Sequence, residues 1–329
     1  MTIDTPAIMI AAPKSSSGKT VFTCGLLSAL QDMEIKPSVF KCGPDYVDPL
    51  FHKSVFSVNS ANLDMFFLDE NSLKNLYYEK SRNSQINIIE GAMGFYDGMG
   101  GISDENSAYA ISKVLGVPVV LIIDIKGSSL SVCALIKGFM EFEKDNNICG
   151  VILNRCSKAL FLTLAPIIFK NNGIPALGYI PTEASLYIEN RQLGLSFNKE
   201  KFKKQAEKIS KIIKETVDIA NLLKLAKKSQ KIEFDRENIF KKNYSLNISV
   251  AKDDAFYFYY SENIEFLEKA GAKITYFSPI NDEHIPKKTD LIYFGGGYPE
   301  LFSRQLSENK GIKSEILSFY NNGGHIFAE

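Results

Sequence analysis

The order of apolar and polar positions divides the first part of the chain into short apolar runs separated by longer helical stretches. The apolar runs AIMIAA, INIIEG, VPVVLIID and CGVILN begin at residues 7, 86, 117 and 149. Between them lie segments with apolar residues at helical spacing, such as Thr20–Met33 and Ser107–Leu115. This alternation is typical of a parallel sheet covered by helices, with ligands at the carboxyl ends of the strands. We therefore predict an α/β domain over residues 1–225.

The pattern changes near residue 199, where the chain becomes rich in Lys, Glu and Asn. Apolar residues at helical spacing predict a closing helix, and the polar stretch KKSQKIEFDREN that follows predicts a linker over residues 226–245. The runs LNISVAKD, KITYF, LIYFGGG and HIFAE then alternate with helical segments. They predict a second, smaller α/β domain over residues 246–329.

Composition and charge narrow the classes of partner. The chain has 329 residues, of which 45% are hydrophobic, and its 38 basic residues balance its 38 acidic ones. Without a basic excess we expect no nucleic-acid partner. The apolar stretch Val117–Ile123 is too short to span a bilayer, and no secretory signal precedes it, so we expect a cytoplasmic protein without a membrane partner. Five cysteines without metal-ligand spacing are expected to be free thiols.

The first apolar run leads into PKSSSGKT and then into a helical segment. A phosphate-binding loop requires this context, because its backbone amides and the start of the helix surround the phosphates. In this loop Lys19 would reach the β- and γ-phosphates of ATP, and the Thr20 hydroxyl would bind Mg²⁺. Pro13 stands where the usual pattern has its first glycine. The predicted ATP-binding residues here are Lys14, Ser15, Ser16, Ser17, Gly18, Lys19 and Thr20.

Acidic residues follow several of the predicted strands. They are Asp45, Asp48, Glu90 and Asp97. A hard cation on a triphosphate takes one or two carboxylates, and Glu90 ends an apolar strand where the phosphates are expected. Each acid taken singly is also compatible with a helix cap or a turn. Asn154 ends the run CGVILN and is a candidate for reading the adenine edge, with a turn asparagine as the alternative.

Short motifs in a fixed order extend this picture over nearly the whole chain. They are SSSGKT, FKCGPDYVDPLFH, NLD, EGAMGFYDG, GVILNR, RQLGL, AKDDAFYFYYSEN, FSPI, FGGGYPEL and GGHIFAE. In sequence and spacing they resemble the cobyrinic acid a,c-diamide synthase family. The resemblance implies a first domain like dethiobiotin synthetase and a second like class I glutamine amidotransferases. It also implies that ATP phosphorylates the a and c carboxylates of cobyrinate and that ammonia, normally from glutamine, displaces the phosphate.

The same resemblance suggests a role for each motif residue. Lys19, Lys41, Asp45 and Asp97 would be catalytic; Thr20, Asp48 and Glu90 would hold Mg²⁺; Tyr46, Asn62, Asp64 and Arg191 would contact the corrinoid, with Asp97 also on that side. Gly295, Gly296 and Gly297 resemble a loop that donates oxyanion-hole amides. The family usually has His after the arginine of RQLGL, where this chain has Gln192.

In the amidotransferase half, the family's GGxIxAE strand continues into a Cys-Gly-Gly turn that carries the glutaminase nucleophile. The sequence printed here ends at Glu329, and none of its five cysteines lies in that context. From this sequence alone we expect no glutamine hydrolysis and amidation from free ammonia.

Other functions remain open at this stage. The same chemistry on hydrogenobyrinate or nickel sirohydrochlorin is one alternative, and a dethiobiotin-synthetase-like carboxylate activator is another. Lys14 occupies the position of an extra lysine in dimeric switch ATPases, which offers a different class of function. A homodimer is also possible.

Overall fold

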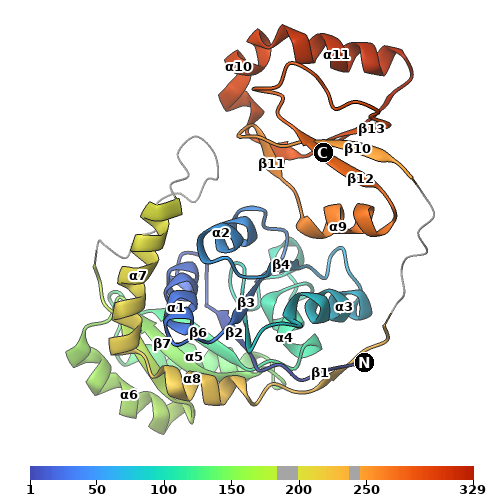
Figure 1. Cartoon of the computed structure of the whole chain (residues 1–329). Coiled ribbons are helices and arrows are strands. Elements are labelled where there is room, and N and C mark those ends of the chain that lie inside the picture. The colour runs from blue at the N-terminus through green and yellow to red at the C-terminus, as the bar shows by residue number, and fades with distance from the viewer. Residues whose placement is uncertain (184–198, 237–244) are drawn as a thin grey trace. The chain divides into compact units, whose positions relative to one another are not determined.

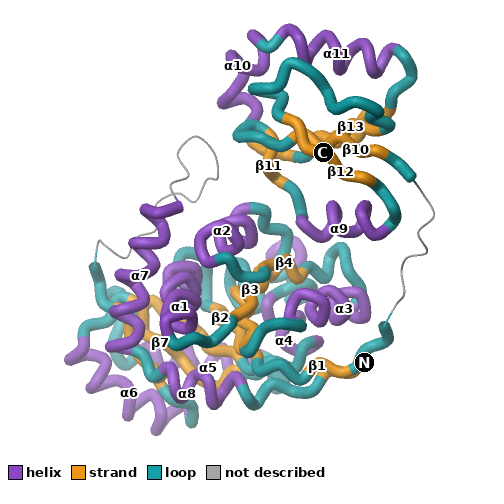
Figure 2. Tube along the Cα trace, in the orientation of Figure 1, coloured by secondary structure: helices purple, strands orange, loops and turns teal. Residues whose placement is uncertain are grey.

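The computed structural model describes residues 1–183, 199–236 and 245–329 (Figure 1). These residues form two compact units, the first containing residues 1–183 and 199–236 and the second residues 245–329. Strands and helices alternate along both units (Figure 2), which confirms the predicted α/β class.

The first unit is built on a seven-stranded sheet whose order is β4-β3-β5-β2-β6-β7-β8. All of its neighbouring strands pair in parallel. The strands are β2 (Ala7–Ala11), β3 (Pro37–Cys42), β4 (Ser60–Leu63), β5 (Ile86–Glu90), β6 (Val119–Asp124), β7 (Ile148–Asn154) and β8 (Ala176–Ile180). The four apolar runs noted in the sequence correspond to β2, β5, β6 and β7.

Helices connect the strands and cover both faces of this sheet. They are α1 (Lys19–Asp32), α2 (Val47–Phe56), α3 (Glu70–Ser81), the 3-10 helix η1 (Met99–Gly101), α4 (Ala108–Val114), α5 (Ser131–Phe142), α6 (Lys158–Asn172), α7 (Lys199–Thr216) and α8 (Ile219–Ala226). The chain moves along the sheet from β2 to β4 in one direction and from β4 to β8 in the other. Right-handed crossovers therefore place α1 and α2 on one face and α3 to α6 on the opposite face. The closing helix α7 packs against α1 and α2.

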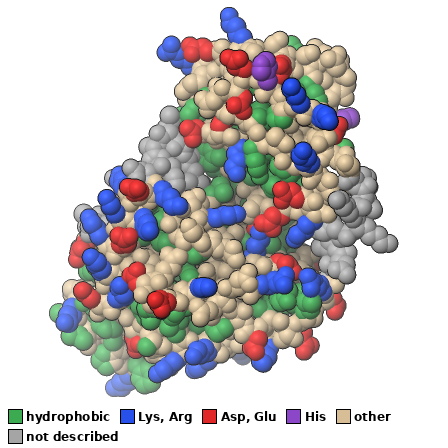
Figure 3. All heavy atoms as spheres, in the orientation of Figure 1, with side chains coloured by type: hydrophobic (Ala, Val, Ile, Leu, Met, Phe, Trp, Pro, Cys, Tyr) green, Lys and Arg blue, Asp and Glu red, His purple; other side chains and the backbone are tan. Residues whose placement is uncertain are grey.

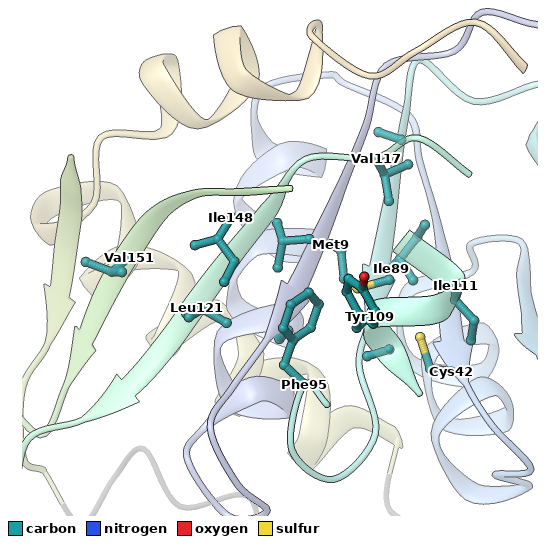
Figure 4. Packing of buried hydrophobic residues seen from close by; sticks show 14 of the residues in the cluster. Met9, Cys42, Ile89, Phe95, Tyr109, Ile111, Val117, Leu121, Ile148 and Val151 are labelled. Carbon is teal, nitrogen blue, oxygen red and sulfur yellow. The ribbon is translucent and has the colours of Figure 1, made fainter. Parts of the chain in front are cut away.

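The core of the first unit lies where the buried strands meet the helices. Met9 on β2, Ile89 on β5 and Leu121 on β6 point into one apolar cluster together with Phe95 and Tyr109 (Figure 4). Phe95 follows β5, and its ring centroid lies 5.8 Å from that of Tyr109 on α4. This packing anchors the base of the loop that carries Asp97.

The stretch after α8 contains one more strand. β9 (Ile232–Glu233) pairs antiparallel with β1 (Thr2–Ile3), and Phe234 packs in the core of the first unit. Part of the segment expected to be a linker therefore belongs to the first unit. The boundaries predicted at residues 225 and 246 otherwise stay a prediction.

The second unit contains a parallel four-stranded sheet in the order β12-β10-β13-β15. Its elements are β10 (Asn247–Ala251), β11 (Phe256–Phe258), α9 (Ser261–Lys269), β12 (Lys273–Phe277), β13 (Leu291–Phe294), β14 (Gly296–Gly297), the 3-10 helix η3 (Pro299–Phe302), α10 (Ser303–Glu308), α11 (Lys310–Asn321) and β15 (His325–Ala328). The short strands β11 and β14 form a separate antiparallel pair.

Two further features concern the surface charges and the lengths of the helices. On the face shown in Figure 3, basic and acidic side chains are interspersed, as their equal numbers in the sequence suggest. Among the described residues, no helix is long and apolar enough to cross a membrane.

Candidate active site

The phosphate-binding loop lies between the buried strand β2 and the start of α1. Gly18 precedes α1 with a φ of 102°, a conformation that side chains rarely adopt. A Cβ atom at Gly18 would also lie 2.4 Å from Nδ2 of Asn154, so a larger residue would displace the Asn154 amide as well as strain the backbone. The positive end of the α1 dipole and its free amides point to the place where phosphates are expected.

Lys19 is buried beneath this loop rather than extended into solvent. Its Nζ donates to the carbonyl of Met93 at 2.5 Å and to the carbonyl of Lys14 at 3.3 Å. Burial, followed by the nearby charge of Lys41, lowers the pKa of Lys19 to about 8. The Ser17 hydroxyl donates to the same Lys14 carbonyl at 2.9 Å, and the Lys14 side chain is exposed.

A buried cluster of charges lies at the carboxyl ends of β3 and β5. Oε1 of Glu90 accepts from the Thr20 hydroxyl at 2.6 Å and from Nζ of Lys41 at 2.8 Å. Lys41 also pairs with Oδ2 of Asp48 at 2.7 Å. The sequence separates these residues by dozens of positions, and the parallel register between β3 and β5 sets Lys41 directly opposite Glu90.

The charge of Lys41 is held by its two partners. Burial opposes an ammonium group here, but Glu90 and Asp48 outweigh that cost and raise the pKa of Lys41 above its usual range. The site therefore carries a permanent buried positive charge between two carboxylates. The ammonium of Lys41 can stabilise the negative charge of a phosphoryl group during transfer. This requires that a cation offset part of the negative charge of Glu90 and Asp48.

The loop between β3 and α2 is shaped by two of the predicted residues. Oδ1 of Asp45 accepts from the amides of Val47 and Asp48 at 2.8 and 3.0 Å, so the Asp45 carboxylate satisfies the first two amides of α2. Burial and the charge of Asp48 raise the pKa of Asp45. Nδ2 of Asn62 donates to the carbonyls of Gly43 and Asp45, both at 2.8 Å. Asn62 therefore supports this loop from β4.

Three other predicted residues lie at the same carboxyl edge. Oδ2 of Asp97 accepts from the amide of Gly94 at 2.8 Å, and Tyr46 is half-buried just before α2. Asp64 is only 7% exposed; its Oδ1 accepts from the Phe66 amide at 2.9 Å, and its Oδ2 is buried without a hydrogen-bond partner in the structure. Burial raises the pKa of Asp64.

Asn154 lies at the end of β7 and contacts the loop itself. Its Nδ2 donates to the Ser17 carbonyl at 2.7 Å, and its Oδ1 accepts from the Arg155 amide at 2.9 Å. Arg155 turns back to pair with Asp124 at the end of β6, with Nε 2.7 Å from Oδ1. In this structure the amide of Asn154 supports the phosphate loop, and its predicted contact with adenine stays a prediction.

In the second unit, the glycine loop is held by a tyrosine. The Gly295 amide donates to the Tyr259 hydroxyl at 2.8 Å, and that hydroxyl donates to the Ala251 carbonyl. Gly296 and Gly297 pair with β11, and a Cβ atom at Gly297 would lie 2.0 Å from the Ala255 carbonyl. The Gly295 amide is therefore engaged within the unit, and the oxyanion role of the loop stays a prediction.

The oxygen ligands at this edge suit a magnesium ion that is bound mainly by phosphates. Thr20, Asp48 and Glu90 bring a hydroxyl and two carboxylates to one place, and hard cations prefer oxygen ligands. No group of three or more His, Cys, Asp or Glu side chains in the described ranges forms a metal cage of its own. Arg191 and Gln192 lie outside the described residues.

Comparison with known proteins decides the family. A model described as the CobQ/CobB/MinD/ParA nucleotide binding domain matches residues 8–194, and one described as the CobB/CobQ-like glutamine amidotransferase domain matches residues 247–329. The cobyrinate a,c-diamide synthase of Picrophilus torridus is 39% identical over 327 residues, which cover 98% of this chain and 74% of that protein. The chain belongs to the cobyrinate a,c-diamide synthase family. The resemblance inferred from the motifs is thereby confirmed.

Other comparisons place this synthase-family chain among bacterial and archaeal relatives. The synthase of Clostridium acetobutylicum is 40% identical over 328 residues, covering 98% of this chain and 73% of that protein. The synthase of Methanobrevibacter smithii is 39% identical over 327 residues, covering 98% and 72%. Among solved structures, the match to the MinD cell division protein of Aquifex aeolicus covers 70% of this chain and 99% of that protein, at 16% identity and with a TM-score of 0.40.

The structure adds one residue to the site that the motif analysis did not single out. His52 is completely buried on α2, and its Nε2 lies 3.9 Å from Oε2 of Glu90. The signal was present in the motif FKCGPDYVDPLFH, because Asp48 and His52 are four residues apart and so share one face of a helix. Only the packing of α2 against β3 and β4 shows that this face meets Glu90.

Proposed function

We propose that the chain uses ATP to convert the a and c carboxylates of cobyrinate into amides through an acyl phosphate. The observation that carries the proposal is the cluster of Thr20, Lys41, Asp48 and Glu90 next to a phosphate-binding loop. A permanent cation held between carboxylates suits phosphoryl transfer, which depends mainly on positioning and charge. Membership of the synthase family supplies the acceptor, a macrocycle that carries carboxylates.

In the proposed first step, an oxygen of the substrate carboxylate attacks the γ-phosphorus of ATP and ADP leaves. The amides at the start of α1 and the ammonium of Lys19 bind the phosphates, and Lys41 offsets the charge that develops on the transferred group. In the second step, the ammonia nitrogen attacks the acyl carbon, and inorganic phosphate leaves as the amide forms. Asp45, whose pKa is raised, or Asp97 would accept the proton released from nitrogen.

We assign Mg²⁺ to the oxygens of Thr20, Asp48 and Glu90. When bound, Mg²⁺ neutralises the charge of the β- and γ-phosphates. Thr20, Asp48 and Glu90 would hold the ion with one hydroxyl and two carboxylates, and in the structure both Thr20 and Lys41 bond Oε1 of Glu90. Tyr46, Asn62, Asp64 and Arg191 are proposed to be on the side of the corrinoid. A cytoplasmic location also belongs to the proposal.

The test is ADP release by the purified chain with ATP, Mg²⁺ and cobyrinate, with ammonium chloride or glutamine as nitrogen donor. We expect turnover that requires cobyrinate and yields the diamide by mass spectrometry. Hydrogenobyrinate and nickel sirohydrochlorin are run in parallel as competing acceptors. Faster ADP release with either of them would replace cobyrinate as the proposed substrate. ADP release at the same rate with and without any macrocycle would contradict the proposed reaction.

A further inference from the structure

Two loops at the carboxyl edge of the sheet expose large apolar side chains. Phe66 and Phe67 follow β4 and are 65% and 67% exposed, and Ile102 in the loop after β5 is 95% exposed. Met93 and Met99 in that second loop are also exposed. Neighbouring exposed apolar side chains mark binding surfaces in soluble proteins. These five residues are called the apolar rim below.

The two phenylalanines are held in place rather than loosely displayed. Their ring centroids are 5.1 Å apart and the rings are nearly perpendicular, at 88°. The carboxylate of Asp64 accepts from the Phe66 amide, and the Asp64 carbonyl accepts from the Leu68 amide at 3.1 Å. A surface ordered before binding pays little conformational entropy when a ligand arrives.

The second loop is ordered by its own backbone. The Gly98 amide donates to the Ser103 carbonyl and the Met99 amide to the Glu105 carbonyl, both at 2.9 Å. Ile102 therefore stands in a closed turn. The same loop contains Asp97, so the apolar rim is joined directly to the predicted catalytic residues.

A pocket of about 560 Å³ is lined by α3 and α4 and bordered by both loops. Met65, the neighbour of Phe66, lines one part of it, and residues 104–106 of the second loop line another. Volumes of this size are usual for small-molecule sites. Residues of the first loop, the second loop, α3 and α4 thus line one hollow, so the two loops border the same pocket.

The charges of this pocket argue against a carboxylate arm as its ligand. Three carboxylates line it, from Glu70, Asp104 and Glu105, against the two ammonium groups of Lys74 and Lys113. Both lysines already have partners, because Lys74 lies 3.5 Å from Glu70, and Lys113 lies 2.7 Å from Asp145. An anionic arm would meet a net negative surface, whereas an apolar face would meet the rim.

We propose that the apolar rim binds the flat, apolar face of the macrocyclic substrate and leaves its carboxylate arms free to reach Lys19 and Lys41. This inference rests on the proposed function. Apolar burial is not directional, so it changes little when the macrocycle turns. One rim could then hold the substrate in both of the orientations that amidation of two different carboxylates requires.

The test compares F66A/F67A with the control L162A/F169A, which removes two exposed apolar side chains from α6. Equilibrium dialysis of cobyrinate without ATP gives the Kd, and steady-state assays give KM for cobyrinate, its monoamide and ATP. For F66A/F67A we expect the Kd and both macrocycle KM values to rise about 10-fold or more, because apolar burial is lost. The KM for ATP and kcat should stay within about 2-fold of wild type, and the control should match wild type throughout.

The conservative variant F66L/F67L guards against misfolding and should restore most of the affinity. Unchanged cobyrinate binding by F66A/F67A, in a preparation whose wild type binds cobyrinate, would overturn the inference alone. So would a rise in KM for only one of the two macrocycles, or an equal rise in KM for ATP. If the wild-type protein neither binds nor amidates cobyrinate, the proposed function is wrong. The assignment of the macrocycle to the apolar rim is then wrong as well.

Discussion

At the scale of single residues, the site depends on charges that would be costly to bury alone. Glu90 is completely buried and reaches both Thr20 and Lys41, with His52 close to its other oxygen. A buried ion is tolerated when each charge has a partner, and removal of one partner leaves the other uncompensated. Glu90 therefore links the stability of the first unit to its proposed chemistry.

The substitution Glu90→Gln tests this link. It keeps the shape of the side chain but leaves Lys41 with Asp48 alone, so we expect a loss of about 3 kcal/mol in the free energy of unfolding. Macrocycle-dependent ADP release should fall about 100-fold or more, because charge stabilisation of the transferred group is lost. Urea unfolding and coupled ADP assays give both quantities. The control is Glu141→Gln, at an exposed position on α5. If the Glu90→Gln variant releases ADP at the wild-type rate, Glu90 has no role in the mechanism.

Asp64 gives a prediction about pH. Its pKa is raised by burial, so the folded chain binds this proton more readily than the unfolded chain, and stability falls as pH rises through the window above the usual aspartate pKa. The variant Asp64→Asn lacks this penalty. We expect it to unfold at higher urea concentration than wild type at pH 7, with the difference shrinking toward pH 4. An equal difference at both pH values would show that Asp64 is not titrating in this range.

At the scale of elements, the end of β7 supports the phosphate loop from outside its own sequence. Asn154 bonds the Ser17 carbonyl and fills the space next to Gly18. The variant Asn154→Ala should bind ATP about 10-fold more weakly, because the hydrogen bond to the Ser17 carbonyl is lost. This bond is expected to contribute about one to two kcal/mol. Isothermal titration gives the affinity. Asn171→Ala, which removes an exposed amide that donates to the Ile167 carbonyl on α6, serves as control. Equal affinities in both variants would argue against the support role.

In the second unit, Tyr259 ties β10 to the glycine loop that follows β13. The variant Tyr259→Phe would leave the Ala251 carbonyl and the Gly295 amide without this hydroxyl, at a cost of about 1–3 kcal/mol. We expect the unfolding transition of this unit to shift to lower urea concentration. Tyr320→Phe, on a side chain that is 62% exposed, should leave the transition in place. A Tyr259→Phe chain as stable as wild type would show that other groups satisfy the loop.

At the scale of the whole molecule, a dimeric switch ATPase forms a dimer when it binds ATP, whereas a synthase needs no such change in oligomeric state. The Lys14 side chain is exposed, and its carbonyl already accepts from Ser17 and Lys19 within the loop. We expect the molar mass measured by light scattering to be the same with and without ATP and Mg²⁺, whether the chain is a monomer or a homodimer. A doubling of mass that requires ATP, and that Lys14→Ala abolishes, would favour the switch ATPase.

The sequence alone determined what depends on neighbouring residues. The β2-loop-α1 context, the apolar runs of β5, β6 and β7 and the glycine at position 18 are local patterns, since strand periodicity and left-handed backbone are encoded within a few positions. The ordered motifs likewise indicated the synthase family before any geometry was known, because their residue types, order and spacing match those of the family.

Only the tertiary structure decided which residues meet. The strand order β4-β3-β5-β2 brings Lys41 beside Glu90 and Glu90 beside Thr20, although long stretches of chain separate them. The same folding places His52 near Glu90 and Asn154 under Gly18, and it sets Phe66 and Ile102 on loops that flank one pocket. No local pattern encodes such contacts, because parallel strands are joined by crossovers and their order in the sheet follows from packing of the whole domain.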